Sequence, residues 1–182
     1  CIFYAGYYRN EQCALGRLVF DTANNAWRRV PDAPVMQRSL FVPHDRWGMT
    51  QLAVQRQGDR LTLLYLGRNL RREAVLCYAE SIDDGVTWQK RGPVIFGTNM
   101  MFLSSQQQPN GDLPGMVQAY AACWTDDGWH VAVIVAGAGL YTARGADLST
   151  LTLQPTPLRA ISDLPIGFVA FDAVRGTNDW TL

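Results

Sequence analysis

Four consecutive residues place different chemical groups side by side, in the order His44, Asp45, Arg46 and Trp47. A carboxylate can act as a general base or stabilise positive charge, and a guanidinium can hold an anion or a hydroxyl group. The indole of Trp47 offers a flat platform on which a ring could stack. The same residues could equally form a loop salt bridge with an imidazole beside it. The sequence therefore indicates either a substrate-facing cluster or a structural one at this point.

Cys1 suggests a second, unrelated chemistry. If the N-terminus arises by self-cleavage, the free α-amine of Cys1 could serve as the base for its own thiol, as in N-terminal nucleophile amidohydrolases and acyltransferases. Cys1 also opens an apolar run, Cys-Ile-Phe-Tyr-Ala-Gly-Tyr-Tyr. A thiol in such a run could instead be buried as a small apolar group.

The cysteines and histidines do not predict a metal site. The four cysteines are widely spaced, none forms a Cys-x-x-Cys pair, and the chain has only two histidines. Burial as free thiols and pairing as disulfides both remain open. No cofactor is implied, although a calcium-like ion would suit a channel lined with carbonyls and carboxylates. The four cysteines are Cys1, Cys13, Cys77 and Cys123.

Composition excludes several classes of function. The 182 residues carry a formal net charge of zero, with 18% charged and 48% hydrophobic residues. This balance argues against an electrostatic nucleic-acid binder, a polybasic membrane-surface protein and a disordered chain. No apolar run approaches the roughly 20 residues of a membrane-spanning helix. The length corresponds to one globular domain with a substantial core.

The local patterns predict an all-β chain of short strands. Helical periodicity is nearly absent, while β-branched and aromatic runs alternate with turn signals such as Asp83-Asp84-Gly85 and Asp126-Asp127-Gly128. The predicted strands are 2–8, 16–21, 27–30, 51–57, 61–68, 74–81, 87–95, 117–124, 129–136, 140–144, 151–155, 168–174 and 179–182.

The strands repeat in the same order along the chain. A polar strand, a strongly apolar strand, a third strand with an acidic turn and a fourth strand recur at a spacing of about 50 to 70 residues. One four-stranded sheet cannot bury both faces alone, and radial stacking of such sheets does so. The repeat therefore predicts β-propeller blades. The approximate blades are 1–35, 49–96 and 116–158, with the start of a further blade at 166–182.

One turn resembles a known blade motif. The segment Ser81-Ile82-Asp83-Asp84-Gly85-Val86-Thr87-Trp88 matches the Asp-box pattern Ser-x-Asp-x-Gly-x-Thr-Trp and is similar to the blade turns of sialidases. The surrounding Gly-Asp-Arg-Leu-Thr-Leu-Leu-Tyr-Leu-Gly-Arg and Gly-Pro-Val-Ile also resemble five-bladed arabinanases, xylosidases and invertases. The chemistry of the motif is that of a turn. We expect Asp83 to accept backbone hydrogen bonds, Gly85 to adopt a positive φ, and Trp88 to pack between sheets, with Ser81 and Thr87 completing the motif.

The resemblance implies a carbohydrate ligand and a site at the innermost strands. Glycosidases of this architecture place carboxylates there, one to protonate the leaving group and one to activate water or attack the sugar. Asp45 and Asp172 are the carboxylates at comparable positions, and His44, Arg46 and Trp47 are the expected substrate contacts. No third carboxylate lies in a comparable place. Arg68 and Arg144 end strands at similar blade positions, where they could form a sialidase-like clamp or remain surface arginines.

The number of predicted blades is too small for a ring. Propellers need at least four blades, and the chain supplies about three, beginning and ending inside predicted strands. We therefore expect another polypeptide to complete the ring, either a second copy or a companion fragment. The preferred function is glycoside hydrolysis in a shared site. The alternatives are the self-processed cysteine nucleophile and a propeller that only binds a glycan or a protein. No targeting pattern indicates a compartment.

Overall fold

The computed structural model confirms the all-β prediction. It describes residues 1–7, 13–70, 73–94, 117–135, 139–154, 159–160, 174–175 and 180–181. Within these ranges the regular structure is β, apart from one short 3-10 helix, η1 (Pro43–Asp45). None of the described helical structure is long and apolar enough to span a membrane. The chain forms two compact units, Cys1–Pro93 and Val94–Leu182.

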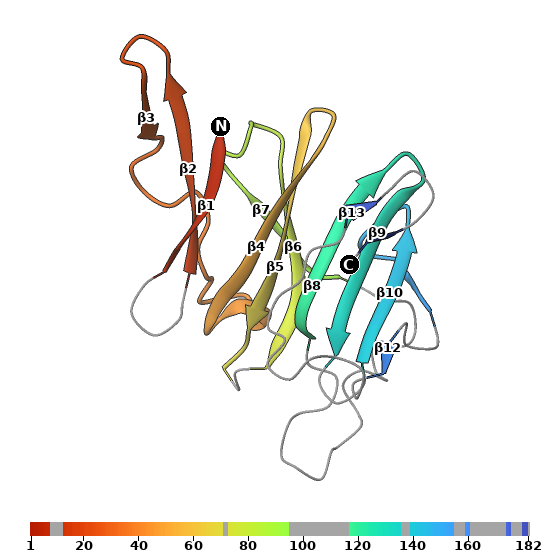
Figure 1. The fold of residues 1–182 in the computed structure, drawn as a ribbon. Coiled ribbons are helices and arrows are strands. Elements are labelled where there is room, and N and C mark those ends of the chain that lie inside the picture. The colour runs from red at the N-terminus through yellow and green to blue at the C-terminus, as the bar shows by residue number, and fades with distance from the viewer. Residues whose placement is uncertain are drawn as a thin grey trace. The chain divides into compact units, whose positions relative to one another are not determined.

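The first unit contains two antiparallel sheets whose strands follow one another in sequence order (Figure 1). The three-stranded sheet is formed by β1 (Ile2–Tyr7), β2 (Cys13–Asp21) and β3 (Ala26–Arg29). The four-stranded sheet is formed by β4 (Gly48–Gln57), β5 (Arg60–Arg68), β6 (Ala74–Ser81) and β7 (Gln89–Pro93). This meander is the strand arrangement expected of a propeller blade.

The second unit repeats the arrangement. Its main sheet runs β8 (Val117–Thr125), β9 (Gly128–Val135), β10 (Gly139–Gly145) and β11 (Thr152–Leu153), and β12 (Arg159–Ala160) also pairs with β10. A separate pair is formed by β13 (Val174–Arg175) and β14 (Trp180–Thr181). β1, β5 and β9 each pair with the strand that leads into an aspartate-capped turn, and in this sense they occupy equivalent places.

The same kind of aspartate occupies the turn after β2, β6 and β10. The carboxylate of Asp21 accepts from the amides of Ala23 and Asn24, and that of Asp147 accepts from the amide of Ser149. Asp83 caps the corresponding turn in the four-stranded sheet. Short acidic side chains favour such turns because they satisfy backbone donors that no strand partner can reach.

Most predicted strand positions agree with the structure to within three residues. The largest differences are at β2 and β4, which begin at Cys13 and Gly48 rather than at residues 16 and 51. Gly16 was predicted as the start of the strand because glycine, which has no side chain to pack, commonly marks the end of a strand. Tyr4 lies in that space, since a Cβ on Gly16 would fall 2.1 Å from the tyrosine ring. The pairing with β1 therefore continues through Gly16 to Cys13.

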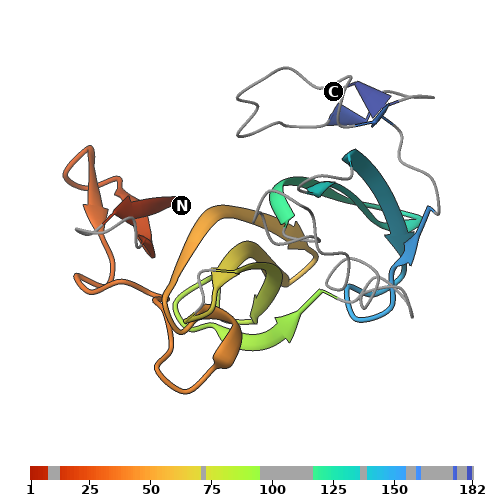
Figure 2. The same cartoon turned by 90° about the horizontal axis from the view of Figure 1, so that it is seen from below.

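A hydrophobic core joins the two sheets of the first unit, which Figure 2 shows next to one another. Strand β5 is buried from Leu61 to Gly67, as expected for a strand covered on both faces. The buried core residues are Cys13, Leu15, Met36, Met49, Leu63, Tyr65, Cys77 and Ala79. Partly buried Phe3, Val35, Leu52, Val54, Val75 and Trp88 pack against them.

The turn between β6 and β7 packs against the three-stranded sheet. The ring of Phe3 contacts that of Trp88 edge-on, with centroids 5.7 Å apart. Gly85 has a φ of +79°, and a Cβ there would lie 2.2 Å from Cζ of Phe3. Beside it, Arg17 of β2 donates both to the backbone carbonyl and to the carboxylate of Asp84. The turn thus connects neighbouring sheets by an aromatic contact and an ion pair.

A pair of glycine substitutions tests this contact. Gly58 also has a positive φ, of +57°, but nothing lies within 4 Å of a Cβ placed there. We expect Gly58→Ala to lower the free energy of unfolding by about 1 kcal/mol, the cost of backbone strain alone. Gly85→Ala should cost at least about 2 kcal/mol more, because the methyl group must displace Phe3. Urea denaturation measures both, and equal losses would contradict the proposed packing.

Candidate functional site

The helix η1 lies at the end of the four-stranded sheet where β4 begins and β5 ends. Pro43 occupies its first turn, where the fixed φ of proline suits a helix start. The backbone of η1 approaches β5 closely at Gly67, since a Cβ on Gly67 would lie 2.6 Å from the carbonyl oxygen of His44. The amide of Trp47 then donates to the carbonyl of Arg68 at 2.8 Å. These contacts hold the predicted cluster against one end of the blade.

Asp45 is the last residue of η1, and it is completely buried. Its carboxylate forms an ion pair with Lys90 of β7 and accepts a hydrogen bond from the hydroxyl of Tyr65 at 3.3 Å. The amide of Ser39 donates to its other oxygen at 3.3 Å. Burial raises the pKa of Tyr65 far above its ordinary value, so the hydroxyl remains a donor. Asp45 therefore connects η1 to both β5 and β7.

This environment gives Asp45 a structural role in the first unit. A carboxylate with no exposed surface and an ammonium partner cannot contact a sugar without rearrangement. The predicted role of Asp45 as a base or stabiliser stays a prediction, and its burial argues against direct contact. Asp172, the second predicted carboxylate, lies outside the described residues.

The exposed side of η1 forms a small pocket of about 260 Å³. Arg46 of the predicted cluster lines it, together with Asn69 and Glu73 from the β5–β6 connection. Asn69 and Glu73 are fixed to each other: the Asn69 amide group donates to the Glu73 carboxylate at 2.5 Å, and the Glu73 backbone amide donates to Asn69 Oδ1 at 3.0 Å. Pro43 and Leu70 supply apolar walls. The pocket thus combines a guanidinium, a carboxylate and an amide.

Trp47 and Arg68 stack beside this pocket. The guanidinium carbon of Arg68 lies 6.0 Å from the centroid of the Trp47 ring, within the range of a cation–π contact. The Nε atom of Arg68 is buried and has no hydrogen-bond partner among the described residues. Buried donors are nearly always paired in folded proteins, so an unpaired one points to an acceptor from outside these residues. His44 is half-buried and does not line the pocket.

The turn from Ser81 to Trp88 is closed by its own side chains. The hydroxyl of Ser81 donates to Asp83 and accepts from the amide of Gly85. Asp83 accepts from the amide and the hydroxyl of Thr87, and the Trp88 indole donates to the carbonyl of Gly85. The hydrogen bond from the Thr87 side chain, followed by that from its amide, lowers the pKa of Asp83 to about 2. The side chains of Ser81, Asp83, Thr87 and Trp88 thus close the turn, while Asp84 pairs outside it with Arg17 and Arg56.

The cysteines differ in environment. Cys1 is exposed, with its sulfur 4.0 Å from a carboxylate oxygen of Asp84. Burial raises the pKa of Cys13 to about 11 and that of Cys77 to about 12, so neither is a thiolate near neutral pH. None of the four cysteines, all of which lie in the described ranges, forms a disulfide. No group of three potential metal ligands occurs within the described ranges.

Sequence reasoning missed three residues of this region: Asn69, Glu73 and Lys90. None of the three is among the predicted site residues. The β5–β6 connection returns to the end of the sheet where η1 lies, which places Glu73 in the pocket with Arg46. The pairing Gly48↔Arg68, which only the structure shows, sets that end of β5 beside the residues that precede β4.

Comparison with known proteins establishes the fold. Neither protein-family models nor curated proteins match the chain. Among solved structures, the chain is similar to a glycosyl hydrolase from Bacteroides ovatus, with a TM-score of 0.57 and 14% identity over 87% of this chain and 47% of that one.

Two further structures are similar to the chain. One represents the GH130 family of mannoside phosphorylases, described as containing glycoside hydrolases that target β-1,2-mannosidic linkages in Candida mannan; its TM-score is 0.56 at 14% identity, covering 87% of this chain and 46% of that one. The other is sucrose-6-phosphate hydrolase from Lactobacillus gasseri, with a TM-score of 0.53 at 15% identity over 85% of this chain and 32% of that one. The chain spans half or less of the length of these three structures. The likeness confirms the predicted partial β-propeller of four-stranded antiparallel blades.

The ion pair between Asp45 and Lys90 can be tested by removing one partner. We expect Lys90→Met to lower the free energy of unfolding by about 3 kcal/mol, because it leaves a buried carboxylate without a counter-charge. Arg60→Met is the control, since it removes an exposed ion pair with Glu80 and should cost less than about 1 kcal/mol. Chemical denaturation measures both variants. Equal losses would show that the buried pair does not hold η1 in place.

The lowered pKa of Asp83 predicts a loss of stability in acid. Folding lowers this pKa from the ordinary 3.8 to about 2, so the ionised carboxylate stabilises the native state above about pH 4. That contribution is lost as the pH falls through 2. We expect the difference in Tm between the wild type and Asp83→Asn to shrink over this interval. Asp59→Asn, in the exposed β4–β5 turn, is the control. A Tm difference between the wild type and Asp83→Asn that does not change with pH would contradict the assigned role of the Asp83 carboxylate.

Proposed function

We propose that this chain belongs to a carbohydrate-processing β-propeller and that it contributes a sugar subsite to a glycoside hydrolase-like centre. The observation that carries the proposal is the pocket beside η1, where Arg46, Asn69 and Glu73 meet next to the stacked Trp47 and Arg68. These five residues are called the rim cluster below.

The chemistry of the rim cluster suits a sugar ring. A pyranose presents hydroxyl groups that both donate and accept, together with an apolar face formed by its C–H bonds. The Glu73 carboxylate would accept from hydroxyl groups, and the Arg46 guanidinium would donate to them. The Trp47 indole, next to the Arg68 guanidinium, adds an aromatic surface beside the pocket. A pocket of about 260 Å³ matches one ring rather than an extended chain.

The similar structures support the same reading, since each is named as an enzyme of glycosides or of a sugar phosphate. Retaining and inverting glycosidases both need two carboxyl groups on either side of the scissile bond. Glu73 is the accessible carboxylate of the rim cluster. Asp172 and a carboxylate from the remaining blades are the candidates for the second. In this proposal Asp45 holds η1, and thereby Arg46 and Trp47, in position.

The proposal has narrower parts, of which the Asp box has support of its own. The hydrogen bonds from Ser81, Gly85 and Thr87 around Asp83 support the resemblance to sialidase-type Asp boxes. A second copy or a companion polypeptide would supply the remaining blades of the ring. Self-processing at Cys1 stays a prediction.

Binding and turnover can be measured on defined sugars. Titration calorimetry with β-1,2-mannobiose and with sucrose 6-phosphate reports affinity, and ion chromatography of released monosaccharides reports hydrolysis. We expect Arg46→Ala and Glu73→Gln each to weaken sugar binding about tenfold to a hundredfold, the equivalent of one charge-assisted hydrogen bond. Arg60→Ala, at the opposite end of β5, should leave binding unchanged.

The outcomes separate the candidate functions. Turnover that is lost in Glu73→Gln supports the enzyme. Binding that depends on Arg46 without turnover favours a glycan-binding propeller instead. Equal affinities for the wild type and both rim-cluster variants would overturn the assignment of the site.

A further inference from the structure

The starts of β4 and β8 share a sequence pattern. The segments Gly48-Met49-Thr50-Gln51 and Gly115-Met116-Val117-Gln118 both have the order Gly-Met-x-Gln. In sequence, each segment stands at the start of the first strand of its sheet, β4 in the four-stranded sheet and β8 in the main sheet of the second unit. The pattern therefore recurs at equivalent places in two blades.

The glutamine in β4 lies at a β-bulge. The register between β4 and β5 shifts between Thr50 and Ala53. Gln51 and Leu52 together therefore lie opposite the single residue Tyr65. A bulge bends its strand and re-aims the side chain of the extra residue, and bulges are frequent next to active sites.

The glutamine in β8 lies at a bulge as well. The register between β8 and β9 shifts between Val117 and Ala119, which leaves Gln118 as the extra residue. Val117 and Ala119 are buried, whereas Gln118 is exposed. The two bulges thus coincide with the two glutamines, although the residues on either side of them differ.

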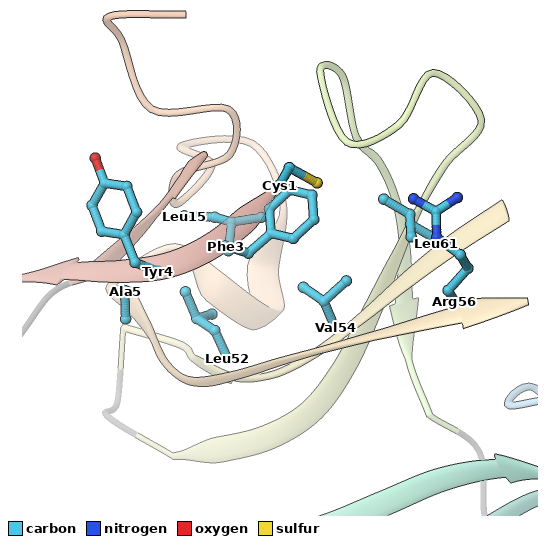
Figure 3. A pocket seen from close by; sticks show the side chains of 9 residues that line it. All are labelled: Cys1, Phe3, Tyr4, Ala5, Leu15, Leu52, Val54, Arg56 and Leu61. Atoms are coloured by element: carbon cyan, nitrogen blue, oxygen red, sulfur yellow. The ribbon is translucent and has the colours of Figure 1, made fainter. Parts of the chain in front are cut away.

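The bulge in β4 serves the core of the first unit. Met49, before the bulge, is completely buried in that core, and Leu52 and Val54, after the bulge, pack against it. Figure 3 shows Leu52 and Val54 on one side of β4, where they line a pocket together with Phe3 of β1. In a regular strand, residues three apart point to opposite faces. The core thus requires an extra residue between Met49 and Leu52, but it does not determine the type of that residue.

The backbone at Gln51 makes glutamine an unfavourable residue for this bulge. Its φ is +50°, in the left-handed region that glycine adopts freely and that a Cβ atom disfavours. A glycine would form the same bulge without this strain. Non-glycine residues held in sparsely populated backbone regions cluster at active sites and ligand contacts. Glutamine is therefore favoured at this position only by what its side chain contacts.

Gln51 lies toward the same end of its sheet as the rim cluster. It follows Gly48 by three residues, and Gly48 pairs with Arg68 of the rim cluster. Gln51 is half-buried. Gln118 lies at the corresponding end of its own sheet, where β8 begins and β9 ends. Each glutamine is thus placed at the end of the blade that, in the first unit, carries the candidate sugar pocket.

We propose that Gln51 and Gln118 bind hydroxyl groups of the carbohydrate ligand and act as specificity-determining residues. An amide donates through its NH₂ group and accepts through its carbonyl oxygen, so one side chain can bond a hydroxyl group in either role. Unlike Arg46 and Glu73, a neutral amide selects a ligand by the position of its hydroxyl groups rather than by charge. This inference rests on the proposed carbohydrate function, but it assigns residues outside the rim cluster.

Substitution by glycine tests whether the Gln51 side chain serves the fold. Gln51→Gly removes the side chain and relieves the positive φ, so its Tm should equal or exceed that of the wild type. Gln55→Gly, four residues further along β4, gains no such relief and should lower the Tm by about 2 °C. Differential scanning calorimetry measures both variants. An equal loss of Tm in the two variants would overturn the inference, because the Gln51 side chain would then be structural.

Nuclear magnetic resonance of the side-chain amides tests ligand contact directly. β-1,2-Mannobiose and sucrose 6-phosphate are titrated into the isotope-labelled chain, and the two NH₂ signals are identified by their loss in Gln51→Gly and Gln118→Ala. We expect both signals to shift on sugar binding, and each variant to bind about tenfold more weakly because one hydrogen bond is lost. Gln89→Ala removes an exposed amide on β7 and should bind like the wild type.

The outcomes separate this inference from the proposed function. Shifts at both glutamines with weaker binding by both variants support the inference, even if Arg46→Ala binds like the wild type and the rim cluster is thereby excluded. Binding that depends on Arg46 but leaves both glutamine signals unchanged overturns the inference and retains the rim cluster. A shift at one glutamine alone overturns the role of the other. Absence of binding by either sugar contradicts both proposals.

Discussion

The packing of the first unit depends on covering both faces of β5. A single antiparallel sheet cannot do this, and the sequence places apolar residues at consecutive positions from Leu63 to Leu66 rather than at alternate ones. A second sheet must therefore pack on one face, and the core around Leu63 and Tyr65 is the result. Because that core is shared, neither sheet would be stable alone. The packing of the two sheets against each other thus holds the pockets and turns of the first unit in place.

The buried pair of Asp45 and Lys90 extends the same constraint to the candidate site. It fixes the short helix η1, and the residues directly after Asp45 reach the surface as Arg46 and Trp47. The charge chemistry that the sequence suggested is therefore divided between two neighbours. Asp45 faces inward and holds the backbone, while Arg46 faces outward, where a ligand could reach it. Residues that are adjacent in the sequence therefore have different environments in the structure, one buried and one exposed.

The sequence was sufficient to predict the strands, the turns and the order of strands in a blade. Alternating apolar and polar residues and turn-forming residues are patterns within a few neighbouring positions. It could not predict the partner of Asp45, since Lys90 lies 45 residues further along the chain. Nor could it place Glu73 beside Arg46, which requires knowing that the β5–β6 connection returns to η1. The start of β2 was missed because Gly16 reads as a boundary, whereas the Tyr4 ring makes it a point of close approach.

The aspartates that cap the hairpins after β2, β6 and β10 have a consequence for folding. Their hydrogen bonds span only two to four residues, so closing each of these turns costs little chain entropy. The hairpins can therefore form early and independently, as sequence-local nuclei. The ion pair between Asp45 of η1 and Lys90 of β7 joins residues 45 positions apart, so it forms only after that long loop has closed. This difference predicts that the hairpins assemble first and that η1, with Arg46 and Trp47 after it, becomes rigid last.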